Sequence, residues 1–338
     1  MYDILSMNPA ELEGLMKELN QPMYRAGQIF NWLHKKNATS FFDMTNLSKN
    51  LRAELETCSY IASVETVKKL ESKNDGTIKY LFELNDKTLI ESVLMKYSHG
   101  NTVCVSTQAG CKMGCYFCAS GTEYVRDLTP GEICAQVYEA SKNSGKIGGV
   151  VLMGCGEPLD NFKSVIHFIE QITHPEGLNI GQRHITLSTC GLVPEIIKLA
   201  DLKLQITLAI SLHAPSDEVR KTFMPIAKKH TLKEIISACR YYIKKTNRRI
   251  TFEYALTKGV NDSPLQAKEL IKLIRGLNCH VNLIPVNKTQ GEFAPTPRND
   301  IQAFADILIG SRIQTTIRRS LGADVNAACG QLRATERR

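Results

Sequence analysis

Residues 103–118 read VCVSTQAGCKMGCYFC, and this stretch decides the fold. Its first five residues, Val103–Thr107, are mostly apolar or β-branched and predict a strand. Three cysteines follow within eight residues, at Cys111, Cys115 and Cys118. A helical pattern comes next, so strand, cysteine loop and helix together predict the first unit of a βα repeat.

The three cysteines predict a metal centre. Thiolates at this spacing can surround one soft site, and a [4Fe–4S] cluster takes one ligand per iron, so three cysteines leave one iron open. Structural zinc is an alternative, but it takes four ligands, usually in two separated pairs, and no CxxC or HxxxH pair follows at a normal distance. Unrelated buried thiols are the other alternative. The surrounding βα pattern favours a cluster on Cys111, Cys115 and Cys118.

Short apolar runs alternate with amphipathic stretches from about residue 102 onward, a pattern typical of helices around a mainly parallel sheet. Six strands predict an α/β fold with a partial (β/α)6 barrel rather than the closed eightfold form. Sites in such folds lie at the carboxyl ends of the strands. The expected strands are Val103–Thr107, Gly149–Met153, His184–Ser188, Gln205–Ser211, Ile250–Tyr254 and His280–Ile284.

The flanking segments differ from the barrel. Residues 1–60 carry apolar positions at helical spacing and predict a small helical domain. Residues 61–100 predict a β-hairpin extension, because two β-rich segments flank Asn85-Asp86. Residues 101–330 then form the barrel with its last cysteine, and residues 331–338 form a basic tail.

The composition is that of an ordinary globular protein of 338 residues with a formal charge of +8. A positive charge suits a polyanionic partner, although many proteins of this size are mildly basic without one. The chain has eleven cysteines, and without a secretion signal these indicate reduced thiols rather than a disulfide scaffold. No window approaches the roughly 20 apolar residues of a transmembrane helix. We therefore expect a cytoplasmic protein with no membrane partner.

A CxxxCxxC motif that opens a βα barrel resembles the radical S-adenosylmethionine (SAM) superfamily, and the resemblance extends over about residues 100–330. It implies two cofactors, a [4Fe–4S] cluster and SAM, whose amino and carboxylate groups chelate the open iron. An electron from the cluster then cleaves SAM to a 5′-deoxyadenosyl radical that abstracts hydrogen from carbon. The electron donor would be a protein such as flavodoxin or ferredoxin.

Polar and small residues at strand ends are the candidates for holding SAM. The Gly156-Glu157-Pro158 turn resembles the superfamily's SAM amino-group site, where a carboxylate accepts from an ammonium. Hydroxyl, imidazole and amide groups at other strand ends suit the ribose, carboxylate and adenine. A simple strand-ending turn and a structural histidine are the alternatives. The candidates are Gly156, Glu157, Ser188, Ser211, Leu212, His213 and Asn287.

The run AACGQL at residues 327–332 resembles an element of the RlmN/Cfr family of RNA adenine methyltransferases. The resemblance implies that one SAM methylates Cys329 and that a second SAM yields the radical that removes hydrogen from this methyl group. A carbon radical is needed because polar methyl transfer does not reach the electrophilic ring carbon. Cys104 matches the resolving cysteine, which forms a transient disulfide with Cys329, and Glu91 matches the proton acceptor.

Pro158 and the Ile284-Pro285 pair match the C2 branch of the family rather than the C8 branch. The resemblance implies methylation of C2 of a 23S rRNA adenosine near the peptidyl-transferase centre, with a tRNA anticodon-loop adenosine as a second substrate, and we expect the enzyme to be a monomer. The helical domain would help to hold this RNA. Cys155, in place of the usual Met, and Cys190 depart from the family pattern. The alternatives are a C8 methyltransferase, a non-catalytic iron–sulfur RNA-binding or redox module, and a radical SAM enzyme acting on a protein or metabolite.

Overall fold

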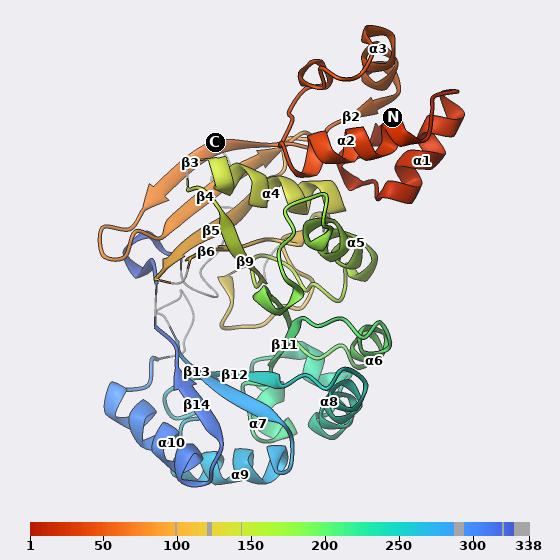
Figure 1. Ribbon diagram of the computed structural model, residues 1–338. Helices are drawn as coiled ribbons and strands as arrows, with labels where there is room; N and C mark the ends of the chain where they lie inside the picture. Colours follow the sequence, from red (N-terminus) through yellow and green to blue (C-terminus); the bar gives the residue numbers. More distant parts are fainter. Residues whose placement is uncertain (99, 120–123, 143, 287–293, 320, 328–338) are drawn as a thin grey trace.

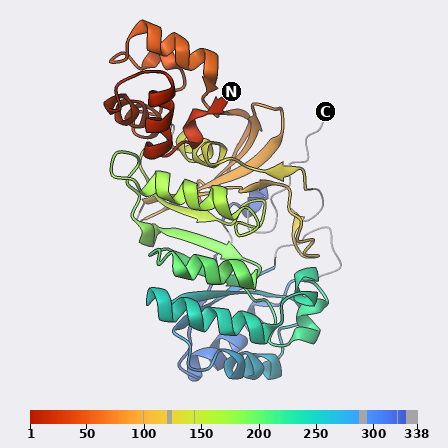
Figure 2. The same ribbon diagram turned by 90° about the vertical axis from the view of Figure 1, so that its right-hand side faces the viewer.

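The computed structural model describes residues 1–98, 100–119, 124–142, 144–286, 294–319 and 321–327. A curved sheet runs through the molecule, with helices along its outer side and a helical unit at one end (Figures 1 and 2). This arrangement confirms the α/β fold class and the partial barrel with a small N-terminal helical part.

Ten strands form the main sheet, in the order β14-β13-β12-β11-β10-β9-β6-β5-β4-β3. All pairs from β6 to β14 are parallel, whereas β3 to β6 are antiparallel. The six expected barrel strands are present, with ends shifted by a few residues, and β14 adds a parallel strand beyond them. The bounds are β3 Val64–Glu71, β4 Ile78–Leu84, β5 Leu89–Tyr97, β6 Gly100–Cys104, β9 Ile147–Leu152, β10 Ile185–Thr189, β11 Thr207–Ser211, β12 Ile250–Leu256, β13 Cys279–Pro285 and β14 Gln314–Ile317.

The expected hairpin is the β4–β5 pair, and β3 lies on its outer edge. Most residues of β3 are exposed and several are charged, which protects an edge strand from pairing with other chains. Because β5 also pairs with β6, this region continues the barrel sheet. A separate short pair, β7 Gln108–Ala109 with β8 Arg126–Asp127, closes the segment that carries the cysteine motif.

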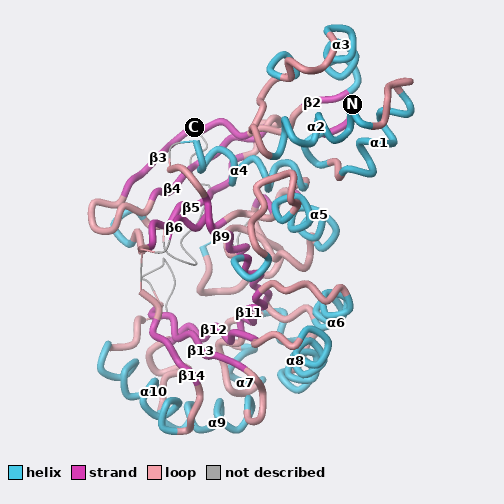
Figure 3. The backbone as a smooth tube through the Cα atoms, in the orientation of Figure 1, coloured by secondary structure: helices cyan, strands magenta, loops and turns pink. Residues whose placement is uncertain are grey.

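Helices follow the barrel strands along the outer side of the sheet (Figure 3). Most of them bury an apolar face, as α5 does with Val165, Phe168 and Ile172, whereas the short α7 buries only Arg220. Side-chain caps fix the starts of several helices, as where Thr231 and Glu234 form a capping box at α8. The bounds are α4 Pro130–Lys142, α5 Phe162–Thr173, α6 Val193–Asp201, α7 Asp217–Lys221, α8 Leu232–Thr246, α9 Pro264–Ile274 and α10 Arg298–Gly310.

The N-terminal unit is helical, as its apolar spacing predicts, and its apolar residues belong to the same core cluster as the barrel. Polar contacts join it to α4 and to the residue before that helix: His34 Nδ1 lies 2.7 Å from Tyr138 Oη, and Thr129 Oγ1 donates to Asp3 at 2.8 Å. No described helix is both long and apolar enough to cross a membrane. The bounds are α1 Pro9–Glu18, α2 Tyr24–His34 and α3 Lys49–Cys58, with β1 Tyr2–Asp3 paired to β2 Ser59–Tyr60.

Candidate active site

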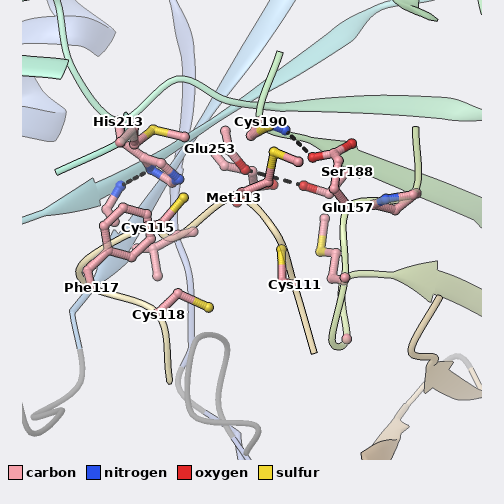
Figure 4. A pocket seen from close by; sticks show the side chains of 18 of the residues that line it. Cys111, Met113, Cys115, Phe117, Cys118, Glu157, Ser188, Cys190, His213 and Glu253 are labelled. Atoms are coloured by element: carbon pink, nitrogen blue, oxygen red, sulfur yellow. Dashed lines mark hydrogen bonds between the residues drawn. The ribbon is translucent and has the colours of Figure 1, made fainter. Parts of the chain in front are cut away.

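One pocket lies at the carboxyl ends of the parallel strands, where the sequence places the site. Figure 4 shows the three motif cysteines on one loop, with His213 and Phe117 to one side and Glu157 and Ser188 to the other. The lining thus combines thiols, a carboxylate, hydroxyls and an imidazole with apolar side chains. The polar and cysteine residues that line it are Cys111, Cys115, Cys118, Glu157, Ser188, Cys190, Ser211, His213, Glu253 and Arg318.

The cysteine loop is held by backbone geometry and by α7. Gly110 and Gly114 adopt positive φ angles of 77° and 63°, which turn the chain around the thiols. Tyr116 N donates to Phe223 O at 3.0 Å, fixing the middle of the loop to the turn after α7. Burial raises the pKa of Cys111 to about 12. An ionised thiol is therefore unfavourable here until a metal takes the place of the proton.

The donor set fits an iron–sulfur cluster. Within the described ranges, no group of three or more His, Cys, Asp or Glu side chains is arranged to hold a single metal ion. A [4Fe–4S] cluster binds each cysteine through a different iron, so its thiols need not converge on one point. Three cysteines on one short loop that line a common pocket meet this requirement.

The turn after β9 packs so tightly that only glycine fits. A Cβ atom on Gly156 would lie 2.7 Å from Gln108 Cβ, and φ there is +106°. One on Gly154 would lie 2.6 Å from Val105 O. The turn fixes the Glu157 carboxylate, which accepts from Cys190 N at 2.7 Å and from Leu159 N at 3.1 Å. Burial raises the pKa of Glu157, while these backbone donors act in the opposite direction.

His213 is held in one orientation at the end of β11. Its φ is +57°, and its Nδ1 accepts from Ala255 N at 2.9 Å. The neutral ring therefore carries its proton on Nε2. Burial, together with the charge of Arg220, lowers the pKa of His213 to about 3. Ser188 and Ser211 also line the pocket, with their Oγ atoms 3.4 Å apart, whereas the side chain of Leu212 lies in the core.

Glu91 and Cys104 lie beside this pocket, on one face of the antiparallel strands. Val93 pairs directly with Cys104, and Glu91 is two residues before Val93, so all three share that face. Both Glu91 and Cys104 are buried, and Lys79 Nζ contacts Glu91 Oε1 at 2.8 Å. Cys155 packs in the same small cluster as Cys104, and Met153 links this cluster to the pocket.

The last described residues dock onto the turn between β3 and β4. Gly322 N donates to Asp75 at 2.9 Å, Lys73 N donates to Asp324 at 3.1 Å, and Lys79 Nζ donates to Asn326 O at 3.3 Å. Ala327 belongs to the cluster that holds Cys104. The predicted methyl carrier Cys329 and the predicted ligand Asn287 lie outside the described residues.

Sequence reasoning missed three buried charges around the site. Glu253 lines the pocket and stands inside the apolar strand β12. A lone carboxylate within an apolar strand could have been predicted from the sequence to be a site residue. Arg220 lies in the polar stretch of α7, where nothing in the sequence separates it from exposed neighbours. Lys79 alternates with apolar residues in β4, which is typical of a surface strand. No disulfide joins two cysteines of the described ranges.

Comparison with known proteins gives consistent matches. Residues 105–271 match the radical SAM superfamily, and residues 2–61 match the ribosomal RNA large subunit methyltransferase N-terminal domain. Proteins described as probable dual-specificity RNA methyltransferase RlmN are 55% identical in Clostridium novyi and 53% identical in Lachnospira eligens; the alignments cover 98% of this chain and 98% and 96% of those proteins. A crystal structure of a radical SAM methyltransferase from Sphaerobacter thermophilus superposes with a TM-score of 0.94 at 43% identity, covering 99% of this chain and 100% of that one.

Proposed function

The chain belongs to the RlmN family of radical SAM RNA methyltransferases, and from this membership we propose that it methylates C2 of an adenine in 23S rRNA and in tRNA. Its relatives are described as dual-specificity RNA methyltransferases, which supports a proposal of two RNA substrates. One observation carries the proposal: Cys111, Cys115 and Cys118 line the same pocket as Glu157 and His213.

The pocket residues are proposed to hold the cluster and SAM side by side. When bound, a [4Fe–4S] cluster supplies the electron that cleaves SAM. Cys111, Cys115 and Cys118 would ligate it as thiolates. Glu157, fixed by two backbone donors, would accept from the SAM ammonium group, while Ser188, Ser211 and the Nε2 proton of His213 would bind its polar atoms. Gly156, Leu212 and Asn287 complete the proposed SAM-binding residues.

A second group of residues is proposed to act on the methyl group and the base. Cys329 would carry the methyl group, and after its methylene radical adds to adenine C2, Glu91 would accept the C2 proton while the unpaired electron would return to the oxidised cluster. The Cys104 thiolate would then attack the Cys329 sulfur, breaking the bond from that sulfur to the new carbon and forming a disulfide. That carbon keeps the electron pair and takes up a proton to become the methyl group. The shared sheet face of Glu91 and Cys104, with Ala327 in the same cluster as Cys104, supports this assignment.

Two features favour C2 over C8 as the methylated atom. Pro158, Ile284 and Pro285, which match the C2 branch, all line the pocket. The relatives reported above are named RlmN, and their alignments cover nearly the whole chain. The C8 reaction remains the second candidate, because it would use the same cysteine set.

The remaining assignments follow from the RNA substrate. Residues 1–60 would help to hold structured RNA, through exposed side chains such as Tyr24, Lys35 and Lys36. Since its proposed substrates are ribosomal RNA and tRNA, we propose a cytoplasmic enzyme, and we propose that it acts as a monomer. Flavodoxin or ferredoxin would reduce the cluster, and two molecules of SAM would be used in each turnover.

The test is an anaerobic assay with reconstituted protein, SAM, reductant and an unmodified 23S rRNA fragment, followed by nucleoside mass spectrometry. Wild type should give 2-methyladenosine, and Cys329→Ala should give none. Cys104→Ala should leave protein covalently attached to RNA. Cys279→Ala is the matched control, since this cysteine begins β13 at the end remote from the pocket. Formation of 8-methyladenosine, or full activity of Cys329→Ala, would contradict the proposal.

A further inference from the structure

Arg220 is completely buried, which is rare for an arginine. Its Nε donates to Leu212 O at 3.1 Å, and its Nη2 donates to Cys190 O at 2.5 Å and to Ser211 O at 3.3 Å. Across the described part of the chain, these bonds from its guanidinium all go to backbone carbonyls, and Nη1 has no hydrogen-bond partner. The group is thus partly solvated by carbonyls, which do not neutralise its charge.

The guanidinium lies behind the wall of the pocket. Two of its three acceptors, Cys190 and Ser211, belong to residues that line the pocket. The Cys115 side chain packs against the cluster that holds Cys190, Phe223 and Met224, and Arg220 donates to Cys190 O, so this predicted cluster ligand lies beside the buried guanidinium. Asp217, which also acts on the charge of Arg220, is half-buried and accepts from Leu232 N at 2.8 Å. The turn that follows Arg220 also anchors the cysteine loop, through the bond from Tyr116 N to Phe223 O.

A buried charge is costly unless an opposite charge faces it. Three thiolates around an iron–sulfur core make a negative group, and its ligand Cys115 packs against Cys190, whose carbonyl accepts from Arg220. We propose that Arg220 is the internal counter-charge of the cluster and that it raises the cluster's reduction potential. The inference rests on the proposed function, because it requires a cluster on Cys111, Cys115 and Cys118.

The direction of the effect follows from electrostatics. Reduction adds one negative charge to a group that is already negative, so a nearby fixed positive charge stabilises the reduced form more than the oxidised form. Net charge and hydrogen bonds to the sulfurs are among the factors that set such potentials. Loss of the charge should therefore make the cluster harder to reduce. Arg220 would act as a positioning residue that tunes electron entry without touching SAM.

The test compares variants that separate charge from hydrogen bonding. Arg220→Lys and Arg220→Gln both lose the guanidinium geometry, but only Gln loses the charge. Lys112→Gln is the matched control, because it removes a charge beside Cys111 that is 43% exposed and already paired with Asp160 at 2.9 Å. The readouts, taken without SAM or RNA, are cluster content and the reduction potential from an anaerobic titration followed by electron paramagnetic resonance.

Arg220→Gln should lower the reduced-to-oxidised ratio at a fixed solution potential by about tenfold or more, which is about 59 mV for one electron. Lys112→Gln should stay close to wild type, and so should Arg220→Lys at low pH, where the buried lysine is protonated. If Arg220→Gln does not fold, the potential of Arg220→Lys is measured against pH. Burial lowers the pKa of a lysine, so its potential should fall with rising pH while that of wild type stays constant.

Two failures are distinguishable. A wild-type protein that binds no [4Fe–4S] cluster would contradict the proposed function itself. A cluster whose potential is the same in wild type and Arg220→Gln, or which changes equally in Arg220→Gln and in Arg220→Lys at low pH, would overturn the role of Arg220 alone. Where Arg220→Gln does not fold, a pH-independent potential in Arg220→Lys would have the same meaning.

Discussion

Replacing Lys79 by methionine should both destabilise the protein and stop RNA methylation. Lys79 and Glu91 form an ion pair at 2.8 Å, and their side chains are only 11% and 5% exposed. Removing one partner of such a buried pair leaves a desolvated charge and costs about 3 kcal/mol. Methionine keeps the length of the side chain, so the loss reports mainly the charge and its bonds to Glu91 and to Asn326 O.

Lys87→Met is the matched control. Lys87 also pairs with a glutamate, Glu83, at 2.6 Å, but its side chain is 76% exposed, so its removal should change the free energy of unfolding by less than about 1 kcal/mol. Urea denaturation measures both variants. Lys79→Met should still cleave SAM, because Lys79 does not line the SAM pocket. Equal stability losses in the two variants, or normal RNA methylation by Lys79→Met, would refute the reasoning.

Three further predictions concern the site and its supports. Gly156→Ala should abolish SAM binding in equilibrium dialysis, because a Cβ there meets Gln108 at 2.7 Å, whereas Gly14→Ala in α1 meets nothing within 4 Å and should bind normally. Burial lowers the pKa of His34 from 6.5 to about 3, so between these pH values the imidazole is protonated in the unfolded chain but not in the folded one. At pH 5 this difference should lower the free energy of unfolding by about 2 kcal/mol, and His34→Phe should reduce the dependence of that free energy on pH. Arg126 donates two bonds to Glu132, at 2.8 and 2.7 Å, and one to Asp86, so Arg126→Lys should lower the free energy of unfolding by about 1 kcal/mol, measurable by denaturation.

The sequence predicts the elements that bury apolar residues and misses those that do not. Strands such as β11 and β12 are apolar runs that the core requires, and they are found where expected. The strands β3 and β14 are largely exposed and polar, so no hydrophobic pattern marks them; pairing with their neighbours determines them instead.

In the candidate site, too, residues with a local sequence pattern are predicted, and residues that depend on distant contacts are not. The cysteine spacing and the Gly156-Glu157 turn are local signals, and the structure brings both to one pocket. Lys79 and Arg220 depend on contacts between distant segments, such as the approach of Lys79 to Glu91 across two strands. A single sequence does not show which charged residues will be enclosed in this way.

Labelled SAM shows whether the methyl group passes through Cys329 as a carbon radical. SAM with a fully deuterated methyl group, reductant, reconstituted protein and the rRNA fragment are combined, and the product nucleoside is analysed by mass spectrometry. The product should be 2-methyladenosine with two deuterium atoms in its methyl group, because one deuterium is abstracted and later replaced by a proton. A methyl group that retains all three deuterium atoms would contradict this route.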